Sequence, residues 1–194
     1  TREECLTEYI LELHDEGIFR LRLDTEEGRV ITRSNPISIS MSRPRYRLFW
    51  GDLHGGQTRI GCGRGSLDDF YQYSRKTACL QFVTHQANDH YVTREEWNEL
   101  RASAAAHYES EEFVTFSGYE WSPPTSRGGD RNVIYSGDDE EIYRSVSYFT
   151  ETEPDNTRLA ENTSEFFEVL KNKAVLVNLH VGGRPANVEY HEPS

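Results

Sequence analysis

The 194-residue chain has little cysteine and no long hydrophobic run. Its three cysteines, Cys5, Cys62 and Cys79, are odd in number and lack a CxxC spacing, so neither a disulfide scaffold nor a structural zinc site is indicated. No apolar stretch approaches the roughly 18 residues that a membrane-spanning helix needs. The N-terminus also lacks the basic start and apolar stretch of a secretory signal. The sequence therefore predicts no membrane association, and it leaves the compartment open.

Positive charge is scarce as well. The chain carries 33 Asp and Glu against 21 Lys and Arg, which gives a formal net charge of −12. Nucleic-acid binding needs a cationic surface that neutralises phosphates, so we do not expect it, whereas a small anionic ligand at one local site is compatible with this charge. The hydrophobic fraction of 36% is low, but 12% aromatic residues favour a folded globular protein over a disordered one.

The first 44 residues predict a small N-terminal α+β appendage. Apolar residues spaced by three and four predict a helix over residues 4–16. Alternating apolar and polar residues between positions 18 and 41, with a turn at 26–28, predict a β-hairpin after it. Pro44 marks the expected boundary, because proline cannot donate a hydrogen bond into a central strand ladder.

Residues 45–194 repeat a rhythm of strand, loop and helix. Strands are predicted over 46–50, 80–84, 113–116, 131–135 and 174–178. Three capping sequences predict helix starts: Ser66-x-x-Asp69, Thr93-x-x-Glu96 and Asn162-x-x-Glu165. Alternating β and α units of this kind predict an α/β domain with a mostly parallel sheet, open or closed into a barrel.

Metal-type ligands follow four of the predicted strands. The loops at the carboxyl ends of parallel strands converge on one face, so we expect these side chains to lie together. Imidazole and carboxylate groups in combination suit a divalent zinc, manganese or iron ion. The predicted metal ligands are Asp52, His54, Glu120 and His180, with His85 or Asp89 completing the set.

Other residues are candidates for contact with an anionic substrate. Arg131 and Arg184 flank two of the strand ends, and a guanidinium offers a fixed fork for phosphate or carboxylate, although ion pairs with the abundant acids explain them equally well. His85 or His90 is the predicted group that moves protons. The spaced glycines at 61, 63 and 65 either cradle an anion or form only a flexible connection.

Five segments, taken in order, resemble an uncharacterised family of the polymerase-and-histidinol-phosphatase (PHP) superfamily. They are WGDLH at 50–54, FVTHQAND at 82–89, FSGYEWS at 116–122, GGDRNVIY at 128–135 and LHVGGR at 179–184. The resemblance covers roughly residues 45–194 and takes in the GIFRLRL and SNPI segments of the appendage. It implies a distorted TIM-like (β/α)7 barrel that holds two or three metal ions and hydrolyses phosphoesters.

The resemblance carries four ligand positions onto this sequence: Asp52 and His54 in the first motif, Glu120 as a carboxylate that bridges two metals, and His180 as the later strand-end histidine. The sequence departs from the family pattern at several places. A longer run replaces the usual Asp-His of the second motif, and His85 or Asp89 is the candidate substitute there. Gly56 occupies the position of the usual second histidine of the first motif, and Asp130 stands where relatives often carry histidine. The resemblance therefore implies a reduced or rearranged metal set.

A barrel of this kind needs about 250 residues, and about 150 follow Pro44. We therefore expect the N-terminal portion of a PHP-like barrel, completed by a second chain or segment. The expected function is a metal-dependent hydrolase, a phosphoesterase that uses metal-activated water. Two alternatives stay open: a metal-dependent hydrolase of carboxylic esters or amides, and a non-catalytic binding or assembly module that a metal stabilises.

Overall fold

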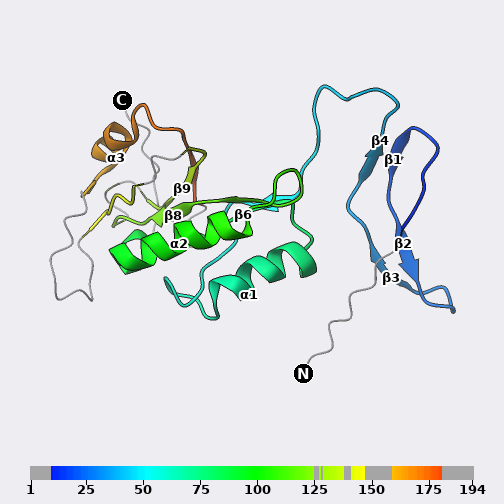
Figure 1. Cartoon of the computed structure of the whole chain (residues 1–194), viewed down its shortest axis with the longest axis horizontal. Coiled ribbons are helices and arrows are strands. Elements are labelled where there is room, and N and C mark those ends of the chain that lie inside the picture. The colour runs from blue at the N-terminus through cyan, green and yellow to red at the C-terminus, as the bar shows by residue number, and fades with distance from the viewer. Residues whose placement is uncertain (1–9, 125–126, 128, 138–140, 147–158, 181–194) are drawn as a thin grey trace. The chain divides into compact units, whose positions relative to one another are not determined.

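A computed structural model describes residues 10–124, 127, 129–137, 141–146 and 159–180 of the chain (Figure 1). The chain divides into two compact units, residues 1–48 and 49–194, so the division falls close to the boundary expected at Pro44. Within the described ranges, no helix has both the length and the apolar character that crossing a bilayer requires.

Two antiparallel strand pairs make up the first unit. Strand β2 (Arg22–Asp24) pairs with β3 (Val30–Arg33), and β1 (Gly17–Phe19) pairs with β4 (Ile37–Ile39). At the turn between β2 and β3, the Gly28 N–H donates to the Thr25 carbonyl at 2.9 Å. The alternating residues between positions 18 and 41 thus form the expected hairpin, as an antiparallel ladder with its turn near residues 26–28.

The helix predicted over residues 4–16 is not found in the portion that the structure describes. Residues 10–16 form no helix, and the side chains of Ile10 and Leu11 are exposed. A short helix is marginal in water unless its apolar face packs against something, and these two side chains have no such packing. Residues 1–9 lie outside the described residues.

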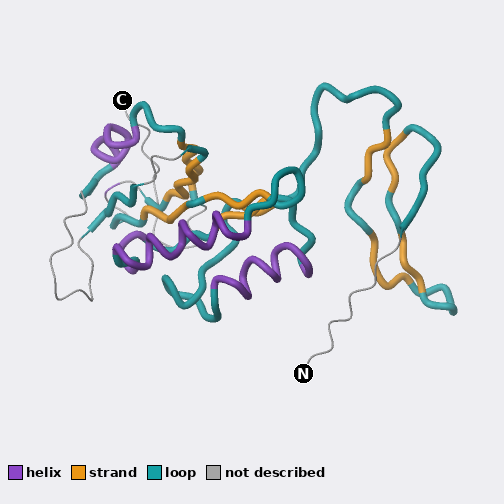
Figure 2. The backbone as a smooth tube through the Cα atoms, in the orientation of Figure 1, coloured by secondary structure: helices purple, strands orange, loops and turns teal. Residues whose placement is uncertain are grey.

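A three-stranded parallel sheet begins the second unit, in the order β5 (Gly51–Asp52), β6 (Phe82–Thr84) and β7 (Val114–Phe116). Helices α1 (Leu67–Gln72) and α2 (Arg94–His107) are the crossovers, and they lie side by side (Figure 2). A π-helical turn, η1 (Tyr73–Thr77), continues α1. Both helices start at the predicted capping boxes, where Ser66 accepts from the Asp69 N–H and Thr93 accepts from the Glu96 N–H.

Strand β5 starts later than the sequence predicts: it begins at Gly51, and residues 46–50 are not in a strand. The Trp50 N–H donates to the Gln81 side-chain oxygen at 3.0 Å, and the Gln81 N–H donates to the Trp50 carbonyl at 2.6 Å. The Gln81 side chain thus accepts the Trp50 N–H, where a backbone carbonyl would accept it in a regular strand pair. Tyr46 and Leu48 are exposed, as expected for residues without a neighbouring strand.

The other sheet of this unit is antiparallel, in the order β10 (Val175–Leu179), β9 (Arg131–Tyr135) and β8 (Gly118–Trp121). Helix α3 (Thr163–Leu170) begins at Asn162, which accepts from the Glu165 N–H as predicted. The expectation of a mostly parallel sheet is therefore correct for β5–β7 and wrong for β8–β10. Only nine residues, 122–130, connect β8 to its partner β9, and a parallel partner needs a crossover of a dozen residues or more. The described strands close no barrel.

Side chains alternate between the two faces of the β8–β10 sheet. One face carries Trp121 opposite Arg131, and Trp121 stacks on Phe166 of α3 with ring centroids 4.2 Å apart, inside the hydrophobic core. The other face carries Glu120 opposite Asn132, which in turn is opposite Asn178. Because successive residues of a strand point to opposite faces, Glu120 and Arg131 lie on opposite sides of the sheet.

Candidate metal centre

Three of the six predicted ligands come together. The ligand atoms of His54, Glu120 and His180, called here the triad, all lie within 4.8 Å of one another. His54 Nε2 is 3.2 Å from Glu120 Oε2, and the rings of His54 and His180 have centroids 4.5 Å apart. These residues are 66 and 60 positions apart along the chain, so the tertiary structure alone makes them neighbours.

Backbone hydrogen bonds hold each member of the triad in place. His54 follows β5, and its N–H donates to the Asp52 carboxylate at 2.8 Å. Glu120 lies within β8, and its N–H donates to the Ala87 carbonyl at 2.8 Å. His180 directly follows β10, and its N–H donates to the Asp130 carbonyl at 3.1 Å. Backbone hydrogen bonds thus fix the triad residue in each of three separate segments.

The electrostatics of the triad favour a charged carboxylate. The hydrogen bond that His54 donates to the Glu120 carboxylate raises the pKa of His54, an effect that burial of the ring opposes. Burial by itself would raise the pKa of Glu120, but the hydrogen bond with His54 and the nearby His180 outweigh it, so that this pKa is lowered. Glu120 is only 5% exposed. An ionised carboxylate in such a place needs a cationic partner, which protonated histidine or a metal ion supplies.

The triad fits a divalent transition metal by its donor chemistry. Two imidazoles and one carboxylate suit zinc, manganese or iron. Three protein ligands leave coordination positions for water or substrate, as in catalytic rather than structural zinc sites. The ligand set expected from the sequence is therefore reduced to His54, Glu120 and His180 among the described residues.

The second carboxylate oxygen of Glu120 has its own partners, which the sequence analysis missed. The Ser122 hydroxyl donates to Glu120 Oε1 at 3.1 Å, and the Asn88 side-chain amide donates to Ser122 Oγ at 2.9 Å. Both residues lie in segments that the sequence analysis singled out, FSGYEWS and FVTHQAND. The spacing of Glu120 and Ser122 by two residues in an extended segment was the available signal, since it puts both side chains on one face.

Asp52 and Asp89, predicted as metal ligands, are not part of the triad. The Asp52 carboxylate accepts the His54 N–H, so it orients the loop that carries a ligand. Asp89 is fully buried and accepts backbone N–H groups from Ser122, at 2.9 Å, and from Ser145. These hydrogen bonds connect Asp89 to two segments that are distant in the sequence, at Ser122 and Ser145.

His85 is not part of the triad either. Its Nε2 accepts the Thr58 N–H at 3.0 Å and lies 3.1 Å from the Thr58 hydroxyl. A backbone amide can only donate, so Nε2 holds the lone pair and the proton of the neutral ring is on Nδ1. Burial lowers the pKa of His85 to about 4.

The buried imidazole of His85 predicts a pH-dependent stability. Its pKa is about 4 in the folded chain and 6.5 in the unfolded chain, so the unfolded chain binds the extra proton between these values. The stabilisation is complete above pH 6.5 and is lost as the pH falls towards 4, by about 3 kcal/mol in all. Urea unfolding from pH 4.5 to 7.5 should show this slope in the wild type and a shallower one in His85→Gln. An equal slope in the two proteins would contradict the prediction, and His14→Ala, at an exposed histidine, is the control.

Arg131, a candidate for gripping an anion, lies in the core. Only 2% of it is exposed, its guanidinium carbon is 5.7 Å from the Trp121 ring centroid and 5.8 Å from that of Phe167, and Nη1 donates to the Gly129 carbonyl at 2.9 Å. Its strand position puts it on the face opposite Glu120. The structure therefore gives Arg131 a packing role. Arg184 lies outside the described residues.

His90, the other candidate for proton transfer, lies on the 3-10 turn η2 (Asp89–Tyr91). Its Nδ1 is 3.3 Å from the Asp89 carboxylate, and its ring is 4.5 Å from that of Tyr91, centroid to centroid. The side chain is 13% exposed. His90 thus lies beside the Asp89 carboxylate and is not part of the triad.

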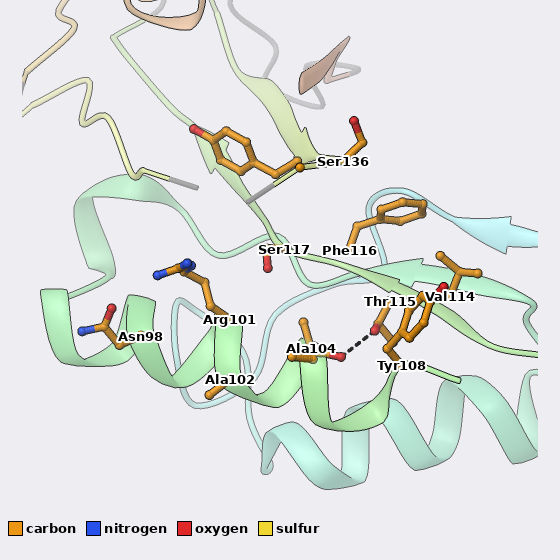
Figure 3. A pocket seen from close by; sticks show the side chains of 13 residues that line it. Asn98, Arg101, Ala102, Ala104, Tyr108, Val114, Thr115, Phe116, Ser117 and Ser136 are labelled. Carbon is orange, nitrogen blue, oxygen red and sulfur yellow. Dashed lines mark hydrogen bonds between the residues drawn. The ribbon is translucent and has the colours of Figure 1, made fainter. Parts of the chain in front are cut away.

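A cavity in the described part of the chain is lined by other residues than the triad. It has a volume of about 800 Å³ and lies between helix α2, strand β7 and the end of β9 (Figure 3). Arg101, Asn98 and Ser117 are among its lining residues, and no member of the triad is. The chemistry of the triad, rather than the size of this cavity, identifies the candidate site.

Comparisons with known proteins place this chain in a family. Residues 64–180 match the family model described as protein of unknown function (DUF3604), and the match includes Glu120 and His180. An uncharacterized protein of Chlamydia pneumoniae is 25% identical over 129 residues, which are 65% of this chain and 20% of that protein. The chain thus spans about a fifth of the length of this curated relative. No solved structure matches the chain.

Proposed function

The chain belongs to the DUF3604 family of proteins of unknown function, and we propose that it is a metal-dependent hydrolase of the PHP type that acts on a small anionic substrate, a phosphoester. The observation that carries the proposal is the triad, with two imidazoles and one carboxylate within 4.8 Å. The order of five sequence segments that resemble PHP proteins supports the choice of a phosphoester.

His54, Glu120 and His180 would hold the ion. When bound, a divalent cation lowers the pKa of water towards neutrality and offsets negative charge that develops on the substrate. The protein residues prepare this chemistry in two ways. Ser122 holds one oxygen of Glu120 and leaves the other facing His54, and burial of Glu120 keeps the carboxylate out of bulk water. A low local dielectric strengthens the attraction of this carboxylate for a cation.

A hydrolase of carboxylic esters or amides is the second candidate. Two histidines and one glutamate, with coordination positions left open, are the protein ligands of zinc in several peptidases. The triad has this composition. A non-catalytic module with a structural metal is the third reading, and the experiment below separates the three.

We also propose that the second unit is the N-terminal portion of a PHP-like barrel. The parallel order β5-β6-β7, with crossover helices α1 and α2, is the arrangement from which such a barrel starts. Additional strands would come from a further segment or a second chain. The greater length of the Chlamydia relative, of which the matched region is 20%, is consistent with this.

Metal content and ester hydrolysis, measured on one preparation, test the proposed function. We expect close to one equivalent or more of zinc, manganese or iron by elemental analysis of protein purified without chelator. We expect release of nitrophenol from 4-nitrophenyl phosphate, stimulated by added Mn²⁺ or Zn²⁺. Glu120→Gln should reduce both strongly, and Glu95→Gln, at an exposed glutamate of α2, should preserve both.

Each other outcome selects a different reading. Hydrolysis of 4-nitrophenyl acetate but not of the phosphate favours the carboxylic ester hydrolase. Bound metal without hydrolysis of either ester favours the non-catalytic module. Less than about a tenth of an equivalent of any transition metal, with Glu120→Gln unchanged, would rule out a metal centre at the triad.

A further inference from the structure

A chain of four hydrogen bonds joins the glycine-rich loop at residues 61–65 to the triad. The Cys62 N–H donates to Gln57 Oε1 at 2.7 Å, Gln57 Nε2 to Asn88 Oδ1 at 2.8 Å, Asn88 Nδ2 to Ser122 Oγ at 2.9 Å, and Ser122 Oγ to Glu120 Oε1 at 3.1 Å. We call Gln57, Asn88 and Ser122 the relay. Its members come from three segments, and its links span 31, 34 and 2 residues of sequence.

All hydrogen bonds of the relay donate in the same direction, and the Cys62 amide, the first donor, fixes that direction. The Cys62 backbone amide can only donate, so the Gln57 oxygen faces it and the Gln57 amide nitrogen faces Asn88. The same reasoning turns the Asn88 nitrogen to Ser122, whose hydroxyl proton is then available for the Glu120 carboxylate. Every bond therefore donates towards the negative charge, an arrangement in which each bond strengthens the next.

The inner half of the relay is largely shielded from water. Asn88 is 8% exposed and Ser122 is 6% exposed, close to the value of 5% for Glu120. Loss of a partner in such a place leaves a polar atom unsatisfied, because no solvent replaces it. The Glu120 side chain is thus held by Ser122 on one oxygen and by His54 on the other.

The glycine-rich loop makes a close approach to the outer end of the relay. A Cβ atom at Gly61 would lie 2.1 Å from Gln57 Oε1, the atom that accepts the Cys62 N–H. Gly61 also has a φ of +100°, in the left-handed region that favours glycine. Gly65, with a φ of +85°, has no atom within 4 Å of such a Cβ. The two glycines therefore share the backbone requirement, and only Gly61 touches the relay.

We propose that Gln57, Asn88 and Ser122 are positioning residues that hold Glu120 in its metal-binding orientation, and that the conformation of the loop at 61–65 thereby sets the metal affinity. The inference rests on the proposed metal centre and goes beyond it by assigning a role to the glycine-rich loop. Partners of metal ligands of this kind contribute about 10- to 100-fold to metal affinity.

Replacement of Ser122 by alanine tests the inner link. With Zn²⁺ as the probe, competition against a chromophoric chelator should show affinity about 10- to 100-fold weaker in Ser122→Ala. Ser74→Ala is the matched control, since Ser74 is a buried serine whose hydroxyl donates to the Phe70 carbonyl outside the relay. In a Glu120→Gln background, Ser122→Ala should have no further effect on affinity, because the relay acts only through Glu120.

Replacement of Gly61 by alanine tests the outer end of the relay. Gly61→Ala and Gly65→Ala should both lose stability in urea, and Gly61→Ala more, because only its Cβ collides with Gln57. Only Gly61→Ala should weaken Zn²⁺ binding, by about 10-fold. Hydrogen exchange measures the same coupling from the metal site to the loop, because coupling between two sites is reciprocal. Zn²⁺ should slow exchange of the Cys62 amide in the wild type but not in Ser122→Ala, and the Asp69 amide, bonded to Ser66, should be unaffected.

The outcomes separate the relay from the metal centre itself. Wild-type protein that binds no Zn²⁺ would overturn both proposals. Wild-type protein that binds Zn²⁺ while Ser122→Ala and Ser74→Ala bind it equally well would overturn the relay and leave the metal centre standing. Equal Zn²⁺ affinities of Gly61→Ala and Gly65→Ala would remove the loop from the inference.

Discussion

Replacing Glu120 by glutamine is expected to weaken Zn²⁺ binding about a thousandfold, or ~4 kcal/mol. A structural zinc site with four ligands contributes about 10–16 kcal/mol in total, so each ligand accounts for roughly 2.5–4 kcal/mol. Glutamine keeps the size of the side chain and removes its charge. The same loss is expected for His54→Ala, whose imidazole lies 3.2 Å from Glu120 Oε2.

Metal-dependent thermal stability provides the measurement beside direct titration. A ligand that binds only the folded chain raises its stability in proportion to the logarithm of ligand concentration over Kd. Wild-type protein should therefore gain melting temperature with added Zn²⁺, and the two variants should not. His14→Ala and Glu95→Gln remove exposed groups of the same kinds and should behave as the wild type. Unchanged Zn²⁺ affinity in both His54→Ala and Glu120→Gln would remove the triad as a metal centre.

Asp89→Ala is expected to reduce the free energy of unfolding by about 3–5 kcal/mol while changing Zn²⁺ affinity much less than Glu120→Gln does. Asp89 is fully buried, and its two carboxylate oxygens accept backbone N–H groups of Ser122 and Ser145. Hydrogen bonds to a charged group contribute about 1.5–3 kcal/mol each, and alanine leaves both N–H groups unsatisfied in the interior.

A second substitution keeps this prediction testable if Asp89→Ala does not fold. Asp89→Asn retains one acceptor oxygen and should lose about half as much stability, measured by urea unfolding. Asp68→Ala is the control, because Asp68 is 71% exposed and its ion pair with His107 is of a kind that contributes little. Loss of Zn²⁺ affinity to the extent seen in Glu120→Gln, with stability unchanged, would instead return Asp89 to the set of metal ligands.

The sequence by itself determined the features that depend on neighbours along the chain. Helices α1, α2 and α3 begin where Ser66, Thr93 and Asn162 were expected to cap them. Each cap joins residues only three positions apart, so no distant part of the chain is needed to form it. The alternating hairpin of the first unit is local in the same sense. The types of metal-binding side chain were also evident, because they follow or lie within the strands.

Only the tertiary structure decided which of these side chains share a site. The register of β8 against β9 puts Glu120 on one face of the sheet and Arg131 on the other. The alternation of residues along a strand does not reveal which of its two faces is turned towards His54 and His180. His54 and His180, and not His85, join Glu120 because of contacts between residues 60 or more positions apart. Tertiary packing also explains why residues 10–16 do not form the predicted helix. Amphipathic spacing gives a stable helix only when another surface covers its apolar face.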